Sequence, residues 1–209
     1  MTQPADRARD GLPVGQRAAE PARIDEVLRR TLGGIGDGVL RERIASLIET
    51  YQLGARVRPE GFLDHHQIVT ALGDCDVALF LSTAESTSLA ALECMAMGCI
   101  VVASNAGALP DLVRPGETGL VLDLFQRGRS LYQAPEQLSD AQYETIIAAL
   151  ARLEASPPET LRRLSAEARR YVAQTYDWSV IVGRTVAEVY RPALAARPGA
   201  SPEHPRERS

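Results

Sequence analysis

Two short apolar segments constrain the fold of this chain more than any other feature. Residues 76–82 (DVALFLS) and residues 99–103 (CIVVA) are almost continuously apolar, and between them lies a helical stretch, residues 87–97, which stops at Gly98. Continuous apolar runs of this length are typical of parallel strands covered on both faces, because a strand with one face in water alternates. The order strand, helix, strand predicts an α/β unit built on a parallel sheet.

The same alternation continues on both sides of this unit. Upstream, apolar residues at helical spacing predict a helix with Gly54 as its C-terminal cap, and Asp64 is placed to cap a helix over 65–72. Asp177 is placed to cap the last helix. The remaining elements are a strand near 56–58, a short helix near 109–113, a strand over 119–122, and helices over 139–154, 158–175 and 178–191. We therefore expect an α/β fold, a Rossmann-like parallel sheet with flanking helices.

Length and composition indicate one domain between two tails. The chain has 209 residues, of which 45% are hydrophobic, enough for one ordinary core. Residues 1–22 and 192–209 are rich in Pro, Gly, Ala and Arg without periodicity, which is typical of disordered tails. The folded domain is expected over residues 23–191.

Charge and cysteine content exclude several classes of protein. The net charge of -4 argues against a nucleic-acid binder, which would need a basic face. No apolar run reaches the length of a transmembrane segment, and the polar N-terminus does not resemble a signal peptide. Cys75, Cys94 and Cys99 lack zinc-like spacing and are expected as small core residues, as in a reducing compartment. We expect a cytoplasmic protein, either free or at the inner face of a membrane.

The expected binding edge lies where the parallel strands end, because open α/β sheets bind ligands beyond the carboxyl ends of their strands. Residues 82–88, residues 104–110 and the GGIGDG turn over 33–38 fall there. The first amides of the helix that follows Ser86, Thr87 and Ser88 have no acceptors inside the helix, so they favour an anion such as a diphosphate. An ordinary capped helix start remains the alternative.

Two glutamates complete this candidate site. Glu85 lies in the loop, and Glu93 lies two helical turns further on among apolar residues. A carboxylate in such a position needs hydrogen-bond donors, and the hydroxyls of a sugar and a ribose are suitable donors. A solvent-facing Glu93 remains the alternative.

Residues 76–123 closely resemble the C-terminal domain of group-1, family-4 glycosyltransferases, which have a GT-B fold. That family carries two glutamates separated by seven residues in a helix of the form "lEAmA.G.PVV", followed by a "GG.pElv..g..G.lv" loop. Residues 34–72 and 176–190 resemble the flanking family segments. The matching positions are Glu85, Glu93, Met95, Ala96, Gly98, Val101, Val102, Gly107, Pro110, Asp111, Gly116 and Gly119.

The resemblance implies a retaining transfer of a glycosyl unit from a nucleotide sugar, with no cofactor and no metal. It assigns Glu85 as the catalytic-site contact with the transferred sugar and Glu93 as the ligand of the ribose. It implies diphosphate binding by amides around Ser88 and Leu89, with Ser86, Thr87 and Gly107 as further substrate-binding residues. The base is expected near Gly36, Gly38 and the loop over residues 58–63.

The chain also departs from the family. Residues 86–88 are Ser-Thr-Ser in place of Gly-Phe-Gly, and Ala106 precedes Gly107 where the family has Gly-Gly. The upstream "GRl...KG" segment is not recognisable, and all 23 Lys+Arg residues are arginine, so a lysine ligand of the diphosphate is impossible. The N-terminal acceptor domain of the GT-B fold is also missing. His65, His66 and His204 are expected to be structural or surface residues.

Three hypotheses follow from this incomplete pattern. The chain supplies the donor-binding half of an enzyme whose acceptor-binding half is a separate chain; it is a truncated gene product; or it is a non-catalytic module that binds a nucleotide sugar or acts as a scaffold. A nucleotide-sugar epimerase of the same fold fits the closing helix less well. Without a second domain, Ile181, Val186 and Val189 on that closing helix are expected to be exposed and to favour self-association.

Overall fold

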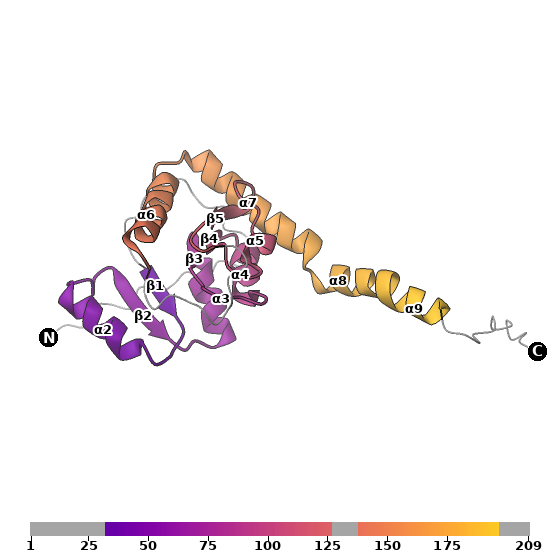
Figure 1. Ribbon diagram of the computed structural model, residues 1–209, viewed down its shortest axis with the longest axis horizontal. Helices are drawn as coiled ribbons and strands as arrows, with labels where there is room; N and C mark the ends of the chain where they lie inside the picture. Colours follow the sequence, from indigo (N-terminus) through magenta and orange to yellow (C-terminus); the bar gives the residue numbers. More distant parts are fainter. Residues whose placement is uncertain (1–31, 127–137, 197–209) are drawn as a thin grey trace, which may run out of the picture.

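The computed structural model describes residues 32–126 and 138–196 (Figure 1). The first part contains β1 (Leu32–Ile35), α2 (Arg41–Thr50), β2 (Val57–Gly61), α3 (His65–Gly73), β3 (Val77–Phe80), α4 (Leu89–Met97), β4 (Ile100–Ser104), α5 (Leu109–Leu112) and β5 (Gly119–Leu122). The second part contains α6 (Asp140–Glu154), α7 (Pro158–Thr175), α8 (Trp178–Thr185), the π-helix η2 (Val186–Tyr190) and α9 (Arg191–Ala195). The expected alternation of strands and helices is confirmed.

All strand pairs are parallel, and they form two sheets. One sheet has the order β3-β4-β5, with Val77 opposite Ile100 and Val101 opposite Gly119. The other pairs β1 with β2. In the doubly wound order 3-2-1-4-5-6, β2 and β1 would hold the first two places and β3, β4 and β5 the last three. Among the described residues, no strand joins the two sheets.

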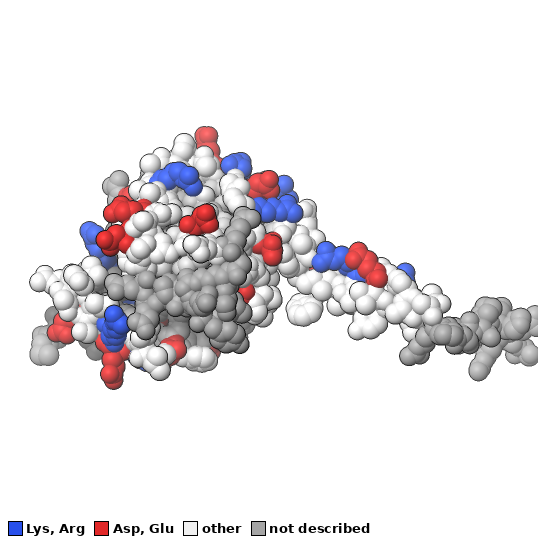
Figure 2. Space-filling view, viewed as in Figure 1, with Lys and Arg blue, Asp and Glu red and all other residues white. Residues whose placement is uncertain are grey.

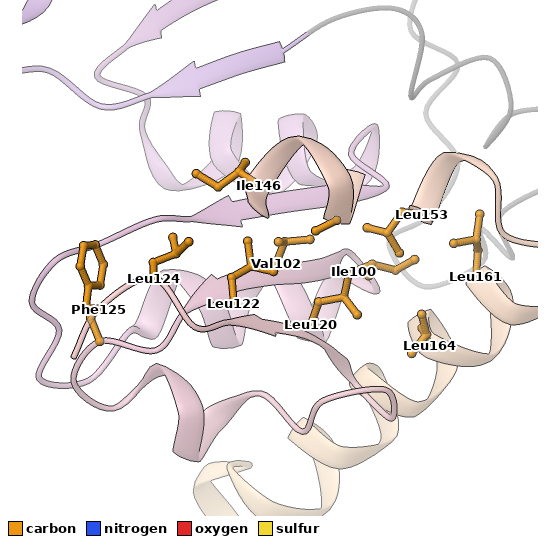
Figure 3. Close-up of a cluster of buried hydrophobic side chains, with 12 residues drawn as sticks. Ile100, Val102, Leu120, Leu122, Leu124, Phe125, Ile146, Leu153, Leu161 and Leu164 are labelled. Atoms are coloured by element: carbon orange, nitrogen blue, oxygen red, sulfur yellow. The ribbon is translucent and has the colours of Figure 1, made fainter. Parts of the chain in front are cut away.

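The central strand β4 explains the two-layer core. Ile100 and Val102 point to one face of the sheet, where they meet Leu153 of α6 and Leu161 of α7 (Figure 3). Val101 and Ala103 belong to the cluster on the other face, which includes Met95 of α4 and Ala168 of α7. Because both faces are covered, every residue of β4 is buried, as the apolar run predicted. β3 lies at the edge of this sheet, and its residues are only half-buried.

Local capping signals place several helix ends. Asp64 forms a capping box with Gln67 at the start of α3, and Asp177 accepts a hydrogen bond from the amide of Ser179 at the start of α8, both as expected. Gly98 ends α4 with φ +85°, a left-handed conformation that suits glycine. The Arg169 guanidinium of α7 then donates to the carbonyl oxygen of Met97 at 3.0 Å, which satisfies a carbonyl group at the end of α4.

Several elements differ from the sequence-based expectations: α4 begins at Leu89 rather than at residue 87, and β2 extends to Gly61. The Gly54 cap was wrong, because α2 ends at Thr50 and Gln52 takes the left-handed conformation with φ +55°. Strand β1 was not predicted, because two of its four residues are glycines, which are poor strand formers. Helix α9 continues past Pro192, where the tail was expected to begin, because proline is tolerated in the first turn of a helix. The expected tails otherwise lie outside the described residues.

The last helices extend away from the body of the protein as an arm, here defined as residues 178–195 (Figure 1). No residue of the arm is buried. Val186 and Val189 are exposed, as expected, whereas Ile181 is half-buried. In the face shown in Figure 2, acidic and basic side chains are interspersed rather than separated. No described helix combines the length and the apolar character that crossing a bilayer requires.

Candidate functional site

The candidate site lies along one edge of the three-stranded sheet, because the carboxyl ends of parallel strands meet at the same edge. Three connections leave this edge: residues 81–88 after β3, residues 105–108 after β4 and residues 123–126 after β5. Glu85 is half-buried in the first connection, and Gly107 lies in the second. The structure therefore brings together the two polar loops that the strand pattern predicted as ligand-binding.

The start of α4 has no side-chain cap, a feature that it shares with α2, α5 and α7. Its N-cap residue, Ser88, is buried but makes no side-chain capping hydrogen bond, whereas Asp64 and Ser139 both form capping boxes. The amide of Leu89 donates to the carbonyl oxygen of Thr87 at 3.2 Å. With no side-chain acceptor from Ser88, the first turn of α4 presents its amides and its positive dipole end at the edge of the sheet.

Glu85 is held by the loop that follows β4. The amide of Ala108 donates a hydrogen bond of 3.0 Å to the carbonyl oxygen of Glu85. Gly107 has φ +55°, and a Cβ atom on it would lie 1.8 Å from the same oxygen. The two loops are thus in backbone contact, and only glycine leaves room for this contact.

Ser104 and Asn105, the first two residues of the 104–110 segment, fix the neighbouring connections. The buried Ser104 hydroxyl donates to the carbonyl oxygen of Ser82 at 2.6 Å. The Asn105 carbonyl oxygen accepts from the amides of Leu124 and Phe125 at 3.1 and 2.9 Å, and its amide group donates to the Phe125 carbonyl oxygen at 2.6 Å and to the Asp123 carboxylate. In the sequence, Ser104 and Asn105 are recognisable as two polar residues directly after the apolar run over residues 99–103.

Glu93 lies on an exposed surface of α4. Its position four residues after Leu89 places both side chains on the same helix face, and Leu89 is 65% exposed. The Glu93 carboxylate therefore faces solvent rather than the core. Ser86 and Thr87 are also exposed, so these two residues and Leu89 present accessible groups around the start of α4, whereas Ser88 is buried.

The GGIGDG turn and the loop near Gly61 meet at the end of the two-stranded sheet. The Gly36 amide donates to the Gly61 carbonyl oxygen at 2.8 Å, and the Gly38 amide donates to the Asp37 carboxylate at 2.9 Å. Arg41, which the sequence analysis did not select, pairs with Asp37 at 2.9 Å and lies beside Gly61. The two segments expected near the base are therefore in contact, with an arginine between them.

The cysteines lie at the opposite edge of the sheet, where β3 and β4 begin. Cys94 and Cys99 are buried and Cys75 is half-buried, and the Cys99 thiol donates to the Cys75 carbonyl oxygen at 3.4 Å. The neighbouring thiols of Cys75 and Cys94, together with burial, raise the pKa of Cys99. Within residues 32–126 and 138–196, no three His, Cys, Asp or Glu side chains are grouped so as to hold a metal ion. His65 and His66 are exposed at the start of α3, and His204 lies outside the described residues.

Comparison with known proteins shows similarity to glycosyltransferases. Residues 23–127 match the family model described as "Glycosyl transferases group 1". The chain is 35% identical over 134 residues to an MMP α-(1->4)-mannosyltransferase from Mycolicibacterium hassiacum, an alignment that covers 64% of this chain and 28% of the relative. It is 29% identical over 184 residues to a glycogen synthase from Mycobacterium tuberculosis, covering 86% of this chain and 39% of the relative.

Solved structures show the same similarity. Sucrose-phosphate synthase from Thermosynechococcus elongatus has a TM-score of 0.61 and 27% identity, covering 85% of this chain and 42% of that one. Anabaena HepE, solved with UDP-glucose, has a TM-score of 0.58 and 21% identity, covering 86% and 45% respectively, and indicates a shared fold. The chain spans about a third of the length of the curated relatives it matches. Because the family model covers half of its residues, the chain belongs to the group 1 glycosyl transferases and has the α/β architecture of their GT-B fold.

Proposed function

We propose that this chain binds the donor of a glycosyltransferase that moves a glycosyl unit from a nucleotide sugar to an acceptor. The observation that carries this proposal is the start of α4, which has no side-chain cap and lies at the carboxyl edge of the sheet, four residues after the half-buried Glu85. An amide-rich helix start attracts a diphosphate, and a carboxylate next to it accepts hydrogen bonds from sugar hydroxyls.

In this proposal, each part of the donor has its own contacts. The amides of residues 88 and 89, with the hydroxyls of Ser86 and Thr87, hold the diphosphate. Glu93 accepts from the ribose hydroxyls and Glu85 from the hydroxyls of the transferred sugar. The positive end of α4 stabilises the charge that develops on the leaving diphosphate, so the proposed transfer uses no metal and no cofactor. The family resemblance leads us to propose that the anomeric configuration is retained.

The base is proposed to bind near Gly36 and Gly38. This turn is joined to Gly61 by a hydrogen bond of 2.8 Å, which supports a rigid pocket wall at the end of β1 and β2. Arg41 is 63% exposed in its side chain and supplies a cation there. The structures of HepE with UDP and with UDP-glucose make uridine nucleotides the first donors to test, and the similarity to a mannosyltransferase adds GDP-mannose.

We further propose that the acceptor site is completed by a separate chain. One observation supports a partner: the arm exposes Trp178, Val182 and Val189. Apolar side chains gathered on one helix favour burial against another surface. Self-association through the arm is the alternative, and sedimentation of the purified chain over a range of concentrations distinguishes a self-associating species from a monomer that awaits its partner.

The donor role is tested by calorimetry with UDP, UDP-glucose, GDP and GDP-mannose. Glu93→Ala is expected to weaken binding of the nucleotide and of the nucleotide sugar alike, because the ribose is common to both. Glu144→Ala is the matched control, since Glu144 is an exposed helical glutamate on α6, remote in sequence from the site. Failure of the wild-type chain to bind any of the four compounds would refute the donor role.

A non-catalytic nucleotide-sugar sensor or scaffold is the second candidate. The exposed position of Glu93 favours it, because a ligand held at an accessible surface can be bound without being enclosed for reaction. Turnover decides between them: the chain is mixed with each polypeptide encoded beside it, and release of the free nucleotide is measured. Binding without turnover in every mixture supports the sensor, and turnover in any mixture supports the transferase.

A further inference from the structure

The contact between Gly107 and Glu85 joins two loops that are far apart in sequence. A Cβ atom on Gly107 would lie 1.8 Å from the carbonyl oxygen of Glu85, 2.7 Å from its carbonyl carbon and 2.8 Å from its amide nitrogen. All three atoms are backbone, so a rotamer change cannot relieve the overlap. The two loops would have to move apart, which changes how the Glu85 loop lies against the end of β4.

We infer that Gly107 is a positioning residue, whose missing side chain sets where the Glu85 carboxylate meets the transferred sugar. The inference rests on the donor-binding role proposed above, and it differs from a direct contact between Gly107 and substrate. The space that faces the Cα atom of Gly107 is already filled by the backbone of Glu85. The Ala108 amide, which donates to the same carbonyl oxygen at 3.0 Å, keeps the two loops together.

Displacement at Gly107 should remain local, because the ends of the Glu85 loop are held independently. Its beginning is fixed by the Ser104 hydroxyl, which donates to the Ser82 carbonyl oxygen at 2.6 Å. Its end is α4, which is buried through Ala91, Cys94 and Met95, and whose last carbonyl group is bound by Arg169. Glu93 lies on α4, so the ribose contact should survive a change that moves Glu85.

The separation between the two glutamates makes a specific measurement possible. In the wild-type chain, the nucleotide sugar should bind more tightly than the corresponding nucleoside diphosphate, because only the former reaches Glu85. Gly107→Ala should retain the affinity for the diphosphate and lose this preference. The expected loss is roughly tenfold to hundredfold in the ratio of the two dissociation constants, the range for hydrogen bonds to a charged group.

Gly116→Ala is a matched control. Gly116 also has a left-handed conformation, with φ +77°, but no atom lies within 4 Å of a Cβ placed on it. Both substitutions therefore introduce backbone strain, whereas only Gly107→Ala introduces the overlap with Glu85. Gly116→Ala should leave the ratio of dissociation constants unchanged.

The experiment measures binding of UDP and UDP-glucose, or of GDP and GDP-mannose where the wild type prefers guanosine, together with circular dichroism of each variant. An unchanged ratio in Gly107→Ala overturns the inference, and so does loss of diphosphate binding in a folded variant. If Gly107→Ala does not fold, Ser104→Ala replaces it, since this change releases the beginning of the same loop, and the same outcomes decide. A wild-type chain that binds none of the four compounds refutes the donor role instead.

Discussion

The Ser104 hydroxyl donates a hydrogen bond of 2.6 Å to the carbonyl oxygen of Ser82, and this bond joins the ends of β3 and β4. Ser104 is fully buried, so Ser104→Ala would leave the Ser82 carbonyl group without this donor. We expect a loss of about 1–3 kcal/mol in the free energy of unfolding, measured by urea denaturation. Ser156→Ala is the control, because its exposed hydroxyl makes a local bond of 2.7 Å to the Arg152 carbonyl oxygen. Equal losses in both variants would contradict the role of Ser104.

Asn105 is expected to contribute more, because it satisfies several backbone groups at once. Asn105→Ala removes the acceptor for the amides of Leu124 and Phe125 and the donor to the Phe125 carbonyl oxygen. We expect a loss of at least ~2 kcal/mol in the free energy of unfolding. Asp123→Ala, which removes a single partner of Asn105, should cost less than Asn105→Ala in the same denaturation experiment. A larger loss in the free energy of unfolding for Asp123→Ala than for Asn105→Ala would contradict this role of Asn105.

Tyr176 should titrate later than an ordinary tyrosine. Partial burial and the hydrogen bond with Tyr171, whose hydroxyl lies 3.4 Å away, raise the pKa of Tyr176 to about 12 from its ordinary 10. A raised pKa in the folded state means that Tyr176 adds stability that is complete below pH 10 and is lost as the pH rises toward 12. Absorbance titration should show a late tyrosinate component that disappears in Tyr176→Phe. A titration in which that variant matches the wild type would contradict the assignment.

The three cysteines should differ in reactivity. The hydrogen bond with Cys99 lowers the pKa of Cys75, which is only half-buried, whereas Cys99 is buried and its pKa is raised. Because the thiolate is the reactive form, iodoacetamide should modify Cys75 first, while Cys94 and Cys99 react only on unfolding. Peptide mass analysis after brief alkylation measures the order. Modification of Cys99 before Cys75 in the folded chain would contradict this prediction.

The arm can be followed through Trp178, the only tryptophan in the chain. Its side chain is 77% exposed, so fluorescence of the dilute protein should be that of a solvated indole and readily quenched by acrylamide. Burial of the arm against a partner or a second copy should shift the emission to shorter wavelength and reduce quenching. Val182→Glu, which places a charge on the arm, should prevent this shift. A blue-shifted, protected tryptophan in the dilute monomer would show that the arm is already covered.

The local pattern of the sequence predicted the frame of this fold well. The apolar runs that became β3 and β4, the cap residues Asp64 and Asp177, and the stop at Gly98 all depend on neighbouring residues. These signals lie in neighbouring residues, so they are visible in the sequence. The strand pattern also predicted which loops would share the binding edge, because the carboxyl ends of parallel strands always do.

The tertiary structure decided how the site is held together. Nothing near Gly107 in the sequence reveals that the backbone of Glu85 lies against it, and nothing near Asn105 reveals its bonds to residues 123–125. The sequence shows that position 107 has no side chain, but it does not show which atoms occupy the space that a side chain would need. The sequence by itself therefore determined the buried strands β3 and β4, the helix ends at Asp64, Gly98 and Asp177, and the candidate glutamates of this protein. Only the packing of the Gly107 loop against the Glu85 loop determined where Glu85 is held. This contact joins backbone atoms, and the pattern of side chains in the sequence does not show which backbone atoms meet.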